Sequence, residues 1–212
     1  MMSFPSIGEW DDILSERHTP RIHNIIKKAR IGIAGLGGLG SNIASMLVRA
    51  GISVMVIADM DNVDASNINR QNYFAAHVGN AKTDATEEML KRINPYVTVK
   101  KHHIRLDRDN IPSVFGNCEI ICEAFDRPSE KAMLINTIME KCPDVKVVAG
   151  SGMAGFGRSN GITTKKIFDR LYICGDGIDM EDAEGGLMAP RVNICAAHMA
   201  NAVISLLVNG DV

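Results

Sequence analysis

A glycine-rich loop constrains the fold of this 212-residue chain more than any other feature. Residues 35–40 read Gly-Leu-Gly-Gly-Leu-Gly and follow a short apolar segment, Arg30–Ala34, which has the composition of a buried strand. Residues 41–50 then carry apolar side chains at helical spacing, and residue 51 is a glycine. A strand, a glycine loop and a helix in this order predict a nucleotide-binding unit within a parallel sheet.

The segments that follow repeat this alternation of strand and helix. We expect strands over residues 53–58, 97–102, 119–124 and 145–149, and helices over residues 82–93, 109–115 and 129–141. Residues 53–58 are apolar on both faces, as are strands of a parallel sheet that helices cover on both sides. The pattern predicts an α/β fold built on a doubly wound, mostly parallel sheet.

The two ends of the chain differ from this central pattern. Near the N-terminus we expect helices over residues 9–17 and 21–28, and beyond residue 150 several glycines interrupt the chain. There we expect an antiparallel extension over residues 162–168 and 171–174, an acidic loop over residues 175–186 and a final helix over residues 190–208. The acidic loop has few apolar anchors, which predicts mobility. We expect a single domain over 1–212, with an N-terminal helical segment (1–29), a nucleotide-binding core (30–150) and the C-terminal extension (151–212).

Charge and cysteine content argue against several classes of protein. The formal net charge is −2, which argues against a nucleic acid as the main partner. No apolar run approaches the length of a membrane span, and the first residues lack the pattern of a secretory signal, so we expect a cytoplasmic protein. The five cysteines are odd in number and form no Cys-x-x-Cys pair, which argues against a disulfide framework or a zinc site.

The glycine loop and a following aspartate together predict a bound nucleotide. The loop lets the backbone approach phosphate oxygens closely, and the N-terminus of the next helix adds a favourable dipole. Asp59 ends the second expected strand, where its carboxylate can accept hydrogen bonds from ribose hydroxyls. This arrangement is compatible with NAD and with ATP alike. The glycines that we expect at the nucleotide are Gly35, Gly37, Gly38 and Gly40.

A polar run after the second strand distinguishes between these two nucleotides. It contains Asn67, Arg70 and Gln71, and Lys82 follows at the start of a helix. An arginine and a lysine that converge on the glycine loop suit a triphosphate, because a leaving pyrophosphate needs its charge neutralised. Taken alone, Lys82 reads as an ordinary exposed helix residue. The ordered set favours ATP chemistry over hydride transfer.

Acidic residues near the ends of the strands have two interpretations. Asp126 follows the strand expected over residues 119–124, at the edge of the sheet where ligands collect in open α/β folds. A carboxylate there can hold Mg²⁺ against a triphosphate, or it can cap the helix that begins near Ser129. Asp61 and Asp64 read as solvated turn residues.

The ordered set resembles the ThiF/MoeB/HesA family, which is related to ubiquitin-activating enzymes. The resemblance covers the chain from about residue 31 to the C-terminus and includes Arg-Ile-Asn-Pro at 92–95 and Met-Ala-Pro at 188–190. The length of the chain suggests a short ThiF-type member. The residues that carry the match are Gly35, Gly37, Gly38, Gly40, Asp59, Asn67, Arg70, Gln71, Lys82 and Asp126.

The resemblance implies an adenylyltransferase that acts on a small ubiquitin-like sulfur carrier with a C-terminal Gly-Gly. The carrier carboxylate attacks the ATP α-phosphate and forms an acyl adenylate and pyrophosphate. On this reading the carrier is ThiS-like and serves thiamine thiazole biosynthesis, while molybdopterin synthesis, another sulfur-carrier route and peptide modification stay open. Asp59 binds ribose, while Arg70, Lys82 and Asn67 stabilise the phosphates. Asp126 binds Mg²⁺.

Family resemblance also implies a homodimer in which an N-terminal arginine of one subunit reaches the ATP of the other. Arg17 is the candidate, and Arg21 competes with it. The chain departs from larger members of the family, because only Cys174 lies near the first of their paired Cys-x-x-Cys zinc motifs and the second is absent. Where some members carry a reactive loop cysteine, this chain has Asp182. Cys174 is either a substitute for that cysteine or a buried structural thiol.

Two other functions fit parts of the pattern. A nicotinamide-dependent oxidoreductase is compatible with the glycine loop and Asp59, but it leaves Arg70 and Lys82 unexplained. A binding module without catalytic activity would keep the fold and use it to hold a partner. Binding of NADH without ATP would favour the first, and an Arg70→Ala variant that changes only stability would favour the second.

Overall fold

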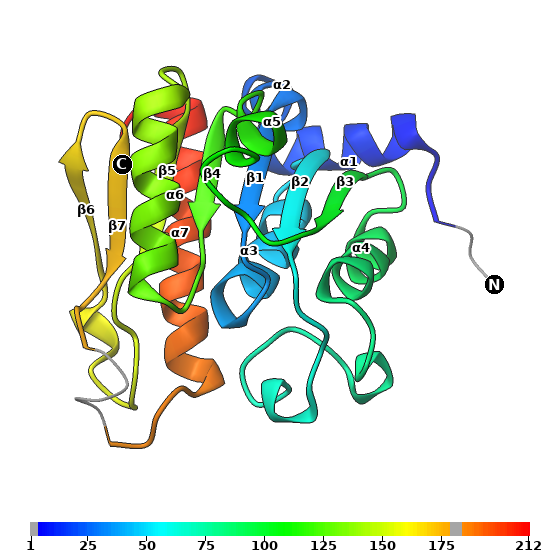
Figure 1. Ribbon diagram of the computed structural model, residues 1–212. Helices are drawn as coiled ribbons and strands as arrows, with labels where there is room; N and C mark the ends of the chain where they lie inside the picture. The colour runs from blue at the N-terminus through cyan, green and yellow to red at the C-terminus, as the bar shows by residue number, and fades with distance from the viewer. Residues whose placement is uncertain (1–3, 179–183) are drawn as a thin grey trace.

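A mostly parallel seven-stranded sheet organises the part of the chain that the computed structural model describes, residues 4–178 and 184–212 (Figure 1). The strand order is β3-β2-β1-β4-β5-β7-β6, and only β6 runs antiparallel to its neighbour. This confirms the predicted doubly wound α/β fold. The strands are β1 (Arg30–Ala34), β2 (Val54–Asp59), β3 (Thr98–His103), β4 (Ile120–Glu123), β5 (Lys146–Gly150), β6 (Thr163–Phe168) and β7 (Leu171–Gly175).

Helices cover both faces of this sheet. One face carries α3, α4 and α7, and the opposite face carries α5 and α6 (Figure 1). Two N-terminal helices, α1 and α2, pack against each other, and α2 also contacts α7. The helices are α1 (Ile7–His18), α2 (Pro20–Lys28), α3 (Gly38–Arg49), α4 (Lys82–Ile93), α5 (Ile111–Phe115), α6 (Pro128–Lys141) and α7 (Ala189–Asn209).

The position of β1 between β2 and β4, inside the sheet, determines where a ligand can bind. It pairs in parallel with β2 on one side and with β4 on the other. The connection from β1 to β2 crosses one face through α3, whereas α5 leads into β4 from the other face. The carboxyl ends of β1 and β4 therefore form a topological switch point, where open α/β sheets bind their ligands.

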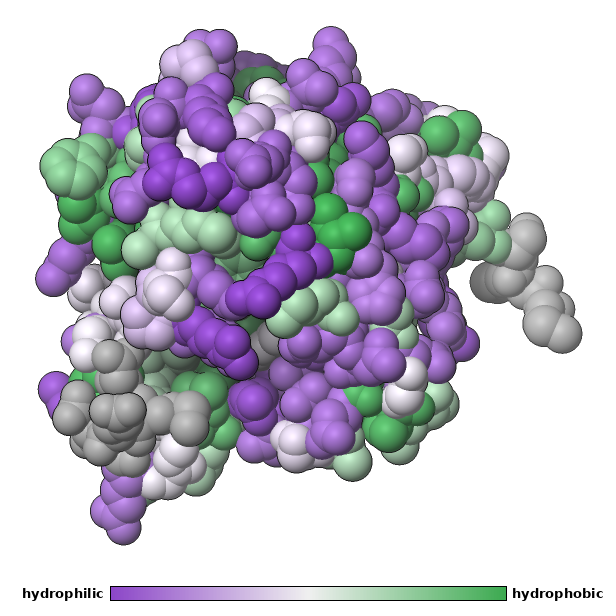
Figure 2. Space-filling model, viewed as in Figure 1, coloured by the Kyte–Doolittle hydropathy of each residue, from purple (hydrophilic) through white to green (hydrophobic). Residues whose placement is uncertain are grey.

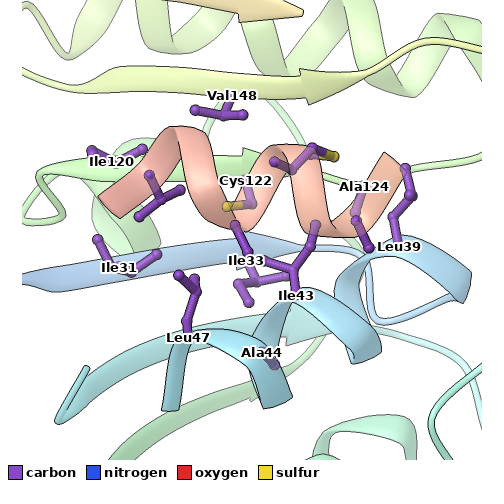
Figure 3. Close-up of a cluster of buried hydrophobic side chains, with 14 of the residues drawn as sticks. Ile31, Ile33, Leu39, Ile43, Ala44, Leu47, Ile120, Cys122, Ala124 and Val148 are labelled. Atoms are coloured by element: carbon purple, nitrogen blue, oxygen red, sulfur yellow. The ribbon is translucent and has the colours of Figure 1, made fainter. Parts of the chain in front are cut away.

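Two apolar cores lie on the two faces of the sheet. Figure 3 shows side chains of β1, α3, β4 and β5 gathered beside α7, among them Ile33, Ile43 and Val148. The second core joins α5 and α6 to the other face and includes Phe115, Ile121 and Leu134. Because each face is packed, the carboxyl ends of the strands are held at fixed separations.

Helix α7 agrees to within one residue at each end with the final helix expected over residues 190–208. It is long and apolar enough to cross a membrane, so the expectation that no segment has this length was wrong. In the structure it packs against α3, β5 and β7, and Cys195, Met199 and Val203 on its inner side are buried. The burial of these side chains identifies α7 as a core helix of this fold.

The edges and surface of the sheet differ from its interior. The two edge strands are mostly exposed, and each has two lysines at its centre, Lys100-Lys101 in β3 and Lys165-Lys166 in β6. The expected C-terminal extension is antiparallel only between β6 and β7, since β7 continues the parallel sheet beside β5. Figure 2 shows mainly hydrophilic side chains on the viewed face, with apolar ones in small separate patches.

Candidate functional site

A cavity of about 660 Å³ opens at the carboxyl ends of the parallel strands. Its walls come from the glycine loop, from the segments that follow β2, β3, β4 and β5, and from the start of α7. Most of the residues that the sequence analysis selected meet here, although they are far apart along the chain. The selected residues that line the cavity are Gly35, Gly37, Gly38, Asp59, Arg70, Gln71, Lys82 and Asp126.

The glycine loop forms one wall through backbone atoms. Gly35 has a positive φ of 87°, which side chains rarely allow, and its N–H donates to the carbonyl of Ala58 over 2.9 Å. Gly40 does not line the cavity. A methyl group on Gly40 would overlap the carbonyl of Gly35, so this glycine permits close packing of the loop on α3. The loop thus presents backbone at Gly37 and Gly38 to the cavity, at the beginning of α3.

Asp59 at the end of β2 is fixed by backbone donors. Its Oδ2 atom accepts the N–H of Leu36 over 2.6 Å, and its Oδ1 atom accepts the N–H of Asp61 over 2.8 Å. Burial raises the pKa of Asp59, while the nearby Lys82 ammonium and these N–H groups act in the opposite direction. The carboxylate therefore joins β2 to the glycine loop and still faces the cavity.

Lys82 begins α4 as a buried residue, whereas taken alone it reads as exposed. Its Nζ atom lies 2.8 Å from the Oδ2 atom of Asp61, and its backbone N–H donates to the carbonyl of Asp61 over 3.0 Å. Asp61 also lines the cavity, so its interpretation as a solvated turn residue was incomplete. The pair places a cation and an anion together beside the end of β2.

Arg70 and Gln71 lie on the turn that faces the start of α3. The side-chain amide of Asn42 donates to the carbonyl of Arg70 over 3.0 Å and to that of Gly38 over 2.7 Å, which joins this turn to the helix. The Oε1 atom of Gln71 is buried and has no hydrogen-bond partner among the described residues. An unpaired amide oxygen at the cavity wall is a ready acceptor for a ligand.

Asn67 does not reach the cavity. Its Oδ1 atom accepts the N–H of Asp64 over 3.1 Å, and its carbonyl accepts the N–H groups of Arg70 and Gln71. Asp64 in turn accepts the N–H of Ser66, so its side chain shapes the turn as well. Asn67 therefore supports the turn that carries Arg70, and the structure does not place its side chain beside the glycine loop.

Asp126 is an exposed residue that lines the cavity after β4. Of its two interpretations, helix capping is wrong, because α6 begins at Pro128 and its N-cap is Arg127. Within residues 4–178 and 184–212, no three His, Cys, Asp or Glu side chains gather as a metal site. Asp126 alone would fit a cation that takes its remaining ligands from a polyphosphate and water.

A partly buried ion pair that the sequence did not predict lies at the cavity. Lys131, in the first turns of α6, pairs with Glu123 at the end of β4 and donates to the carbonyl of Gly150 at the end of β5 over 2.7 Å. Burial raises the pKa of Glu123, and the charge of Lys131 opposes that shift. The pair joins the ends of β4 and β5 and adds a further cation to the site, whose lining also includes Arg105 and Arg127.

A second missed pair supports the opposite side of the cavity. Arg191, near the start of α7, is buried and pairs with Asp176, which follows β7. Its guanidinium also donates to the carbonyls of Gly157 over 2.8 Å and Arg158 over 3.2 Å. The arginine joins the start of α7 to the glycine-rich segment after β5, whose residues Met153 and Ala154 line the cavity.

The remaining predicted residues lie outside the cavity. Arg17 is in the last turn of α1, and the α1–α2 pair packs beside Gly51, which precedes β2 at the amino edge of the sheet (Figure 1). Asp182 and its neighbours in the acidic loop, residues 179–183, lie outside the described residues, so the mobility predicted for this loop stays a prediction. Cys174 is fully buried, and burial raises its pKa, which indicates a structural thiol.

Comparisons with known proteins place this fold and this cavity in context. The sequence matches the model of the ThiF family over residues 13–211. The molybdopterin-synthase adenylyltransferase of Salmonella typhimurium is 30% identical over 189 residues, which cover 86% of this chain and 74% of that protein. The adenylyltransferase and sulfurtransferase UBA4 of Candida glabrata is 28% identical over 189 residues. The match covers 86% of this chain but only 43% of UBA4, so the chain spans less than half of that relative.

A solved structure has the same fold over nearly the whole chain. The Escherichia coli tRNA N6-threonylcarbamoyladenosine dehydratase TcdA, in complex with AMP, superposes with a TM-score of 0.84. The match covers 98% of this chain and 99% of that one at 18% sequence identity. At this identity the likeness shows the shared fold.

Proposed function

This chain belongs to the ThiF family, and from that premise we propose that it is an ATP-dependent adenylyltransferase that activates a carboxylate. A carboxylate oxygen attacks the α-phosphorus of ATP, the bond to the β-phosphate oxygen breaks, and pyrophosphate leaves. The products are a mixed acyl–phosphate anhydride with AMP and free pyrophosphate. The observation that carries the proposal is the convergence of Arg70, Lys82 and Asp126 on the glycine-loop cavity.

On this proposal each part of the cavity has its own task. The backbone at Gly37 and Gly38, at the N-terminus of α3, would receive phosphate oxygens. Asp59 would accept hydrogen bonds from the ribose hydroxyls, and the buried amide oxygen of Gln71 offers a further acceptor. Arg70 and Lys82 would neutralise charge that develops on the leaving pyrophosphate, where a positioned cation lowers the barrier most. In support, the E. coli structure of the same fold has been solved with AMP and with ATP.

We further propose that Mg²⁺ accompanies ATP and that Asp126 supplies its one protein ligand. Mg²⁺ commonly binds through one or two carboxylates together with substrate phosphates and water, which suits a single exposed aspartate at the cavity wall. When bound, the ion would screen the negative charge of the phosphates. Arg70 and Lys82 would remain the groups of the chain that contact the leaving pyrophosphate.

The proposed carboxylate is the C-terminal Gly-Gly of a small ubiquitin-like sulfur carrier. The names of the molybdopterin-synthase and UBA4 adenylyltransferases support this class of substrate. The resemblance to short ThiF-type proteins implies a ThiS-like carrier of thiamine thiazole biosynthesis, whereas the relatives are named for other functions. We retain the thiamine carrier as the specific proposal to be tested against those alternatives, in a cytoplasmic homodimer. Arg17, in the last turn of α1, does not line the cavity of its own chain, and we propose that it reaches the cavity of a second subunit.

The deciding experiment is ATP–pyrophosphate exchange with purified ThiS-like and molybdopterin-type carriers that end in Gly-Gly. Exchange that requires one of these carriers and falls sharply in Asp126→Ala would support carboxylate adenylation. Glu140→Ala is a matched control, because Glu140 is an exposed carboxylate of α6 whose described partner, Arg108, does not line the cavity. ATP binding without exchange would favour a binding module. Binding of NADH with no binding of ATP would overturn the proposal in favour of an oxidoreductase.

A further inference from the structure

Asn69 joins two walls of the cavity through one side-chain amide. Its Oδ1 atom accepts a hydrogen bond from Nη1 of Arg70 over 2.8 Å, and its Nδ2 atom donates to the carbonyl of Leu187 over 3.1 Å. Arg70 and Leu187 both line the cavity, although 117 residues separate Leu187 from Arg70 in the sequence. Asn69 itself does not line it. The amide therefore acts on the site through its neighbours.

The direction of this amide follows from its two partners. A carbonyl oxygen can only accept, so the NH₂ group of Asn69 must face Leu187. That orientation turns the amide oxygen toward the guanidinium of Arg70, which can only donate. The carbonyl of Leu187, just before α7, thus determines that the amide oxygen of Asn69, and not its nitrogen, faces Arg70.

Arg70 has little freedom once this contact forms. The same Nη1 atom also donates to the carbonyl of Ser66 over 3.2 Å, and the aliphatic part of the side chain packs over Gly38. Asn42 holds the backbone of Arg70 to the start of α3. These contacts occupy one edge of the guanidinium and leave its other N–H groups for a ligand. A cation that is oriented before the ligand arrives loses less entropy on binding.

We propose that Asn69 is a positioning residue of the nucleotide site, and that it orients the Arg70 guanidinium toward the phosphates of ATP from an anchor on Leu187. The inference rests on the proposed function, because it assigns Arg70 to a polyphosphate. It adds to the site a residue that acts on the ligand through Arg70 and does not itself line the cavity.

Equilibrium binding of ATP tests this proposal without requiring turnover. Asn69→Ala should weaken binding about fivefold, which corresponds to the net loss of one ordinary hydrogen bond on an exposed turn. Asn69→Asp should weaken it further, because a carboxylate would neutralise the arginine and could no longer donate to Leu187. A merely structural role predicts the reverse order, since aspartate has the shape of asparagine and alanine does not. Asn80→Ala is the control, because Asn80 is an exposed amide whose side chain has no described hydrogen bond.

The Arg70→Ala background shows whether Asn69 acts through the arginine. If it does, adding Asn69→Ala to Arg70→Ala produces no further loss of ATP affinity. An Asn69→Ala variant that binds ATP as the wild type does, or that loses the same factor in both backgrounds, overturns the positioning role alone. Wild-type protein that does not bind ATP overturns the proposed function and this inference together. Thermal unfolding of each variant identifies any loss that comes from misfolding.

Discussion

The Nζ atom of Lys82 lies 2.8 Å from the Oδ2 atom of Asp61, and the two side chains differ in exposure, at 8% for the lysine and 54% for the aspartate. The lysine is a buried cation whose described anionic partner faces the cavity. An incoming polyphosphate would therefore meet a lysine that is already charged and oriented. The polyphosphate would either displace Asp61 from the Lys82 ammonium or bind the ammonium together with Asp61.

Replacing Lys82 with methionine should reduce ATP–pyrophosphate exchange by about 10²-fold or more, because one positioned charge would be lost where charge develops in the transition state. Methionine keeps most of the length of the side chain, so the change in packing is small. Lys91→Met is the matched control, since Lys91 lies on the same helix, is half exposed and pairs with Glu87. Equal losses in the two variants would contradict a special role for Lys82.

Replacing Asp61 with asparagine should lower the free energy of unfolding by about 1–2 kcal/mol, because the buried Lys82 ammonium would lose its charged acceptor. Urea unfolding with an unchanged m-value measures the effect. The comparison variant is Asp84→Asn, whose aspartate pairs with Lys101 and where both side chains are exposed. In Asp84→Asn the free energy of unfolding should fall by no more than about 1 kcal/mol. A larger loss at Asp84 than at Asp61 would disprove the argument.

The buried pair of Arg191 and Asp176 should make stability depend on acid pH. Burial alone would raise the pKa of Asp176, but hydrogen bonds from Arg191 and from the N–H of Ile178 lower it below its ordinary value of 3.8. A carboxyl with a lower pKa in the folded state adds stability that is complete above about pH 4 and is lost as the pH falls through the folded value. Arg191→Met should cost about 3 kcal/mol at pH 7, because it leaves Asp176 buried without its cation.

Denaturant unfolding between pH 2 and pH 7 checks this window. Asp176→Asn should be less stable than the wild type at pH 7, and the difference should shrink toward pH 2. A difference that stays constant over this range would show that Asp176 contributes through packing and not through its charge.

Alanine substitutions at Gly40 and Gly37 should have different effects, the first on folding and the second on ATP binding. Gly40→Ala should prevent folding or destabilise the protein severely, because the new methyl group would overlap the carbonyl of Gly35. At Gly37 the nearest atom to a new methyl group is Nε2 of Gln71 at 3.8 Å, so Gly37→Ala should fold. It should still weaken ATP binding, because the methyl group would stand at the cavity wall. Circular dichroism and ATP titration report the two effects separately, and a Gly37→Ala variant with unchanged affinity would place the phosphates elsewhere.

Replacing Cys174 with serine should leave ATP–pyrophosphate exchange within about twofold of the wild type. Cys174 is buried in the core beside α7, its pKa is raised by burial, and its thiol lies 3.4 Å from the hydroxyl of Thr164. A thiol in such surroundings is a poor nucleophile. Downstream transfer of sulfur to the carrier should survive as well. If adenylation persists while sulfur loading stops, Cys174 has a catalytic role that the structure does not suggest.

The strands and long helices could be predicted because apolar runs and breaking residues mark their ends. Arg30–Ala34 and Lys82–Ile93 have the bounds that we expected, since Gly35 ends the first and Asn94-Pro95 the second. The loop residues of the cavity could also be selected, because the topology brings the carboxyl ends of parallel strands to one edge. Elements whose ends are set by such local patterns can therefore be predicted from the sequence alone.

The ion pairs of the site could not be predicted, because their partners are not close in the sequence or follow no local pattern. Glu123 ends an apolar strand and finds Lys131 only because α6 folds back over the sheet. Arg191 and Asp176 meet across a loop, and neither residue belongs to a recognised motif. Asn67 is a residue whose predicted role was not found in the structure. Its amide oxygen accepts a backbone N–H of its own turn and does not face a ligand in the cavity.

The lysine pairs at the centres of β3 and β6 limit how copies of this chain can associate. A sheet edge offers unpaired backbone groups to any other strand, but a strand added at either edge would crowd ammonium groups along its length. Two copies that meet edge to edge would bring four lysines together, and this repulsion opposes the growth of a continuous sheet. Association through helices and loops avoids that repulsion, and it leaves the strand ends free to shape the cavity.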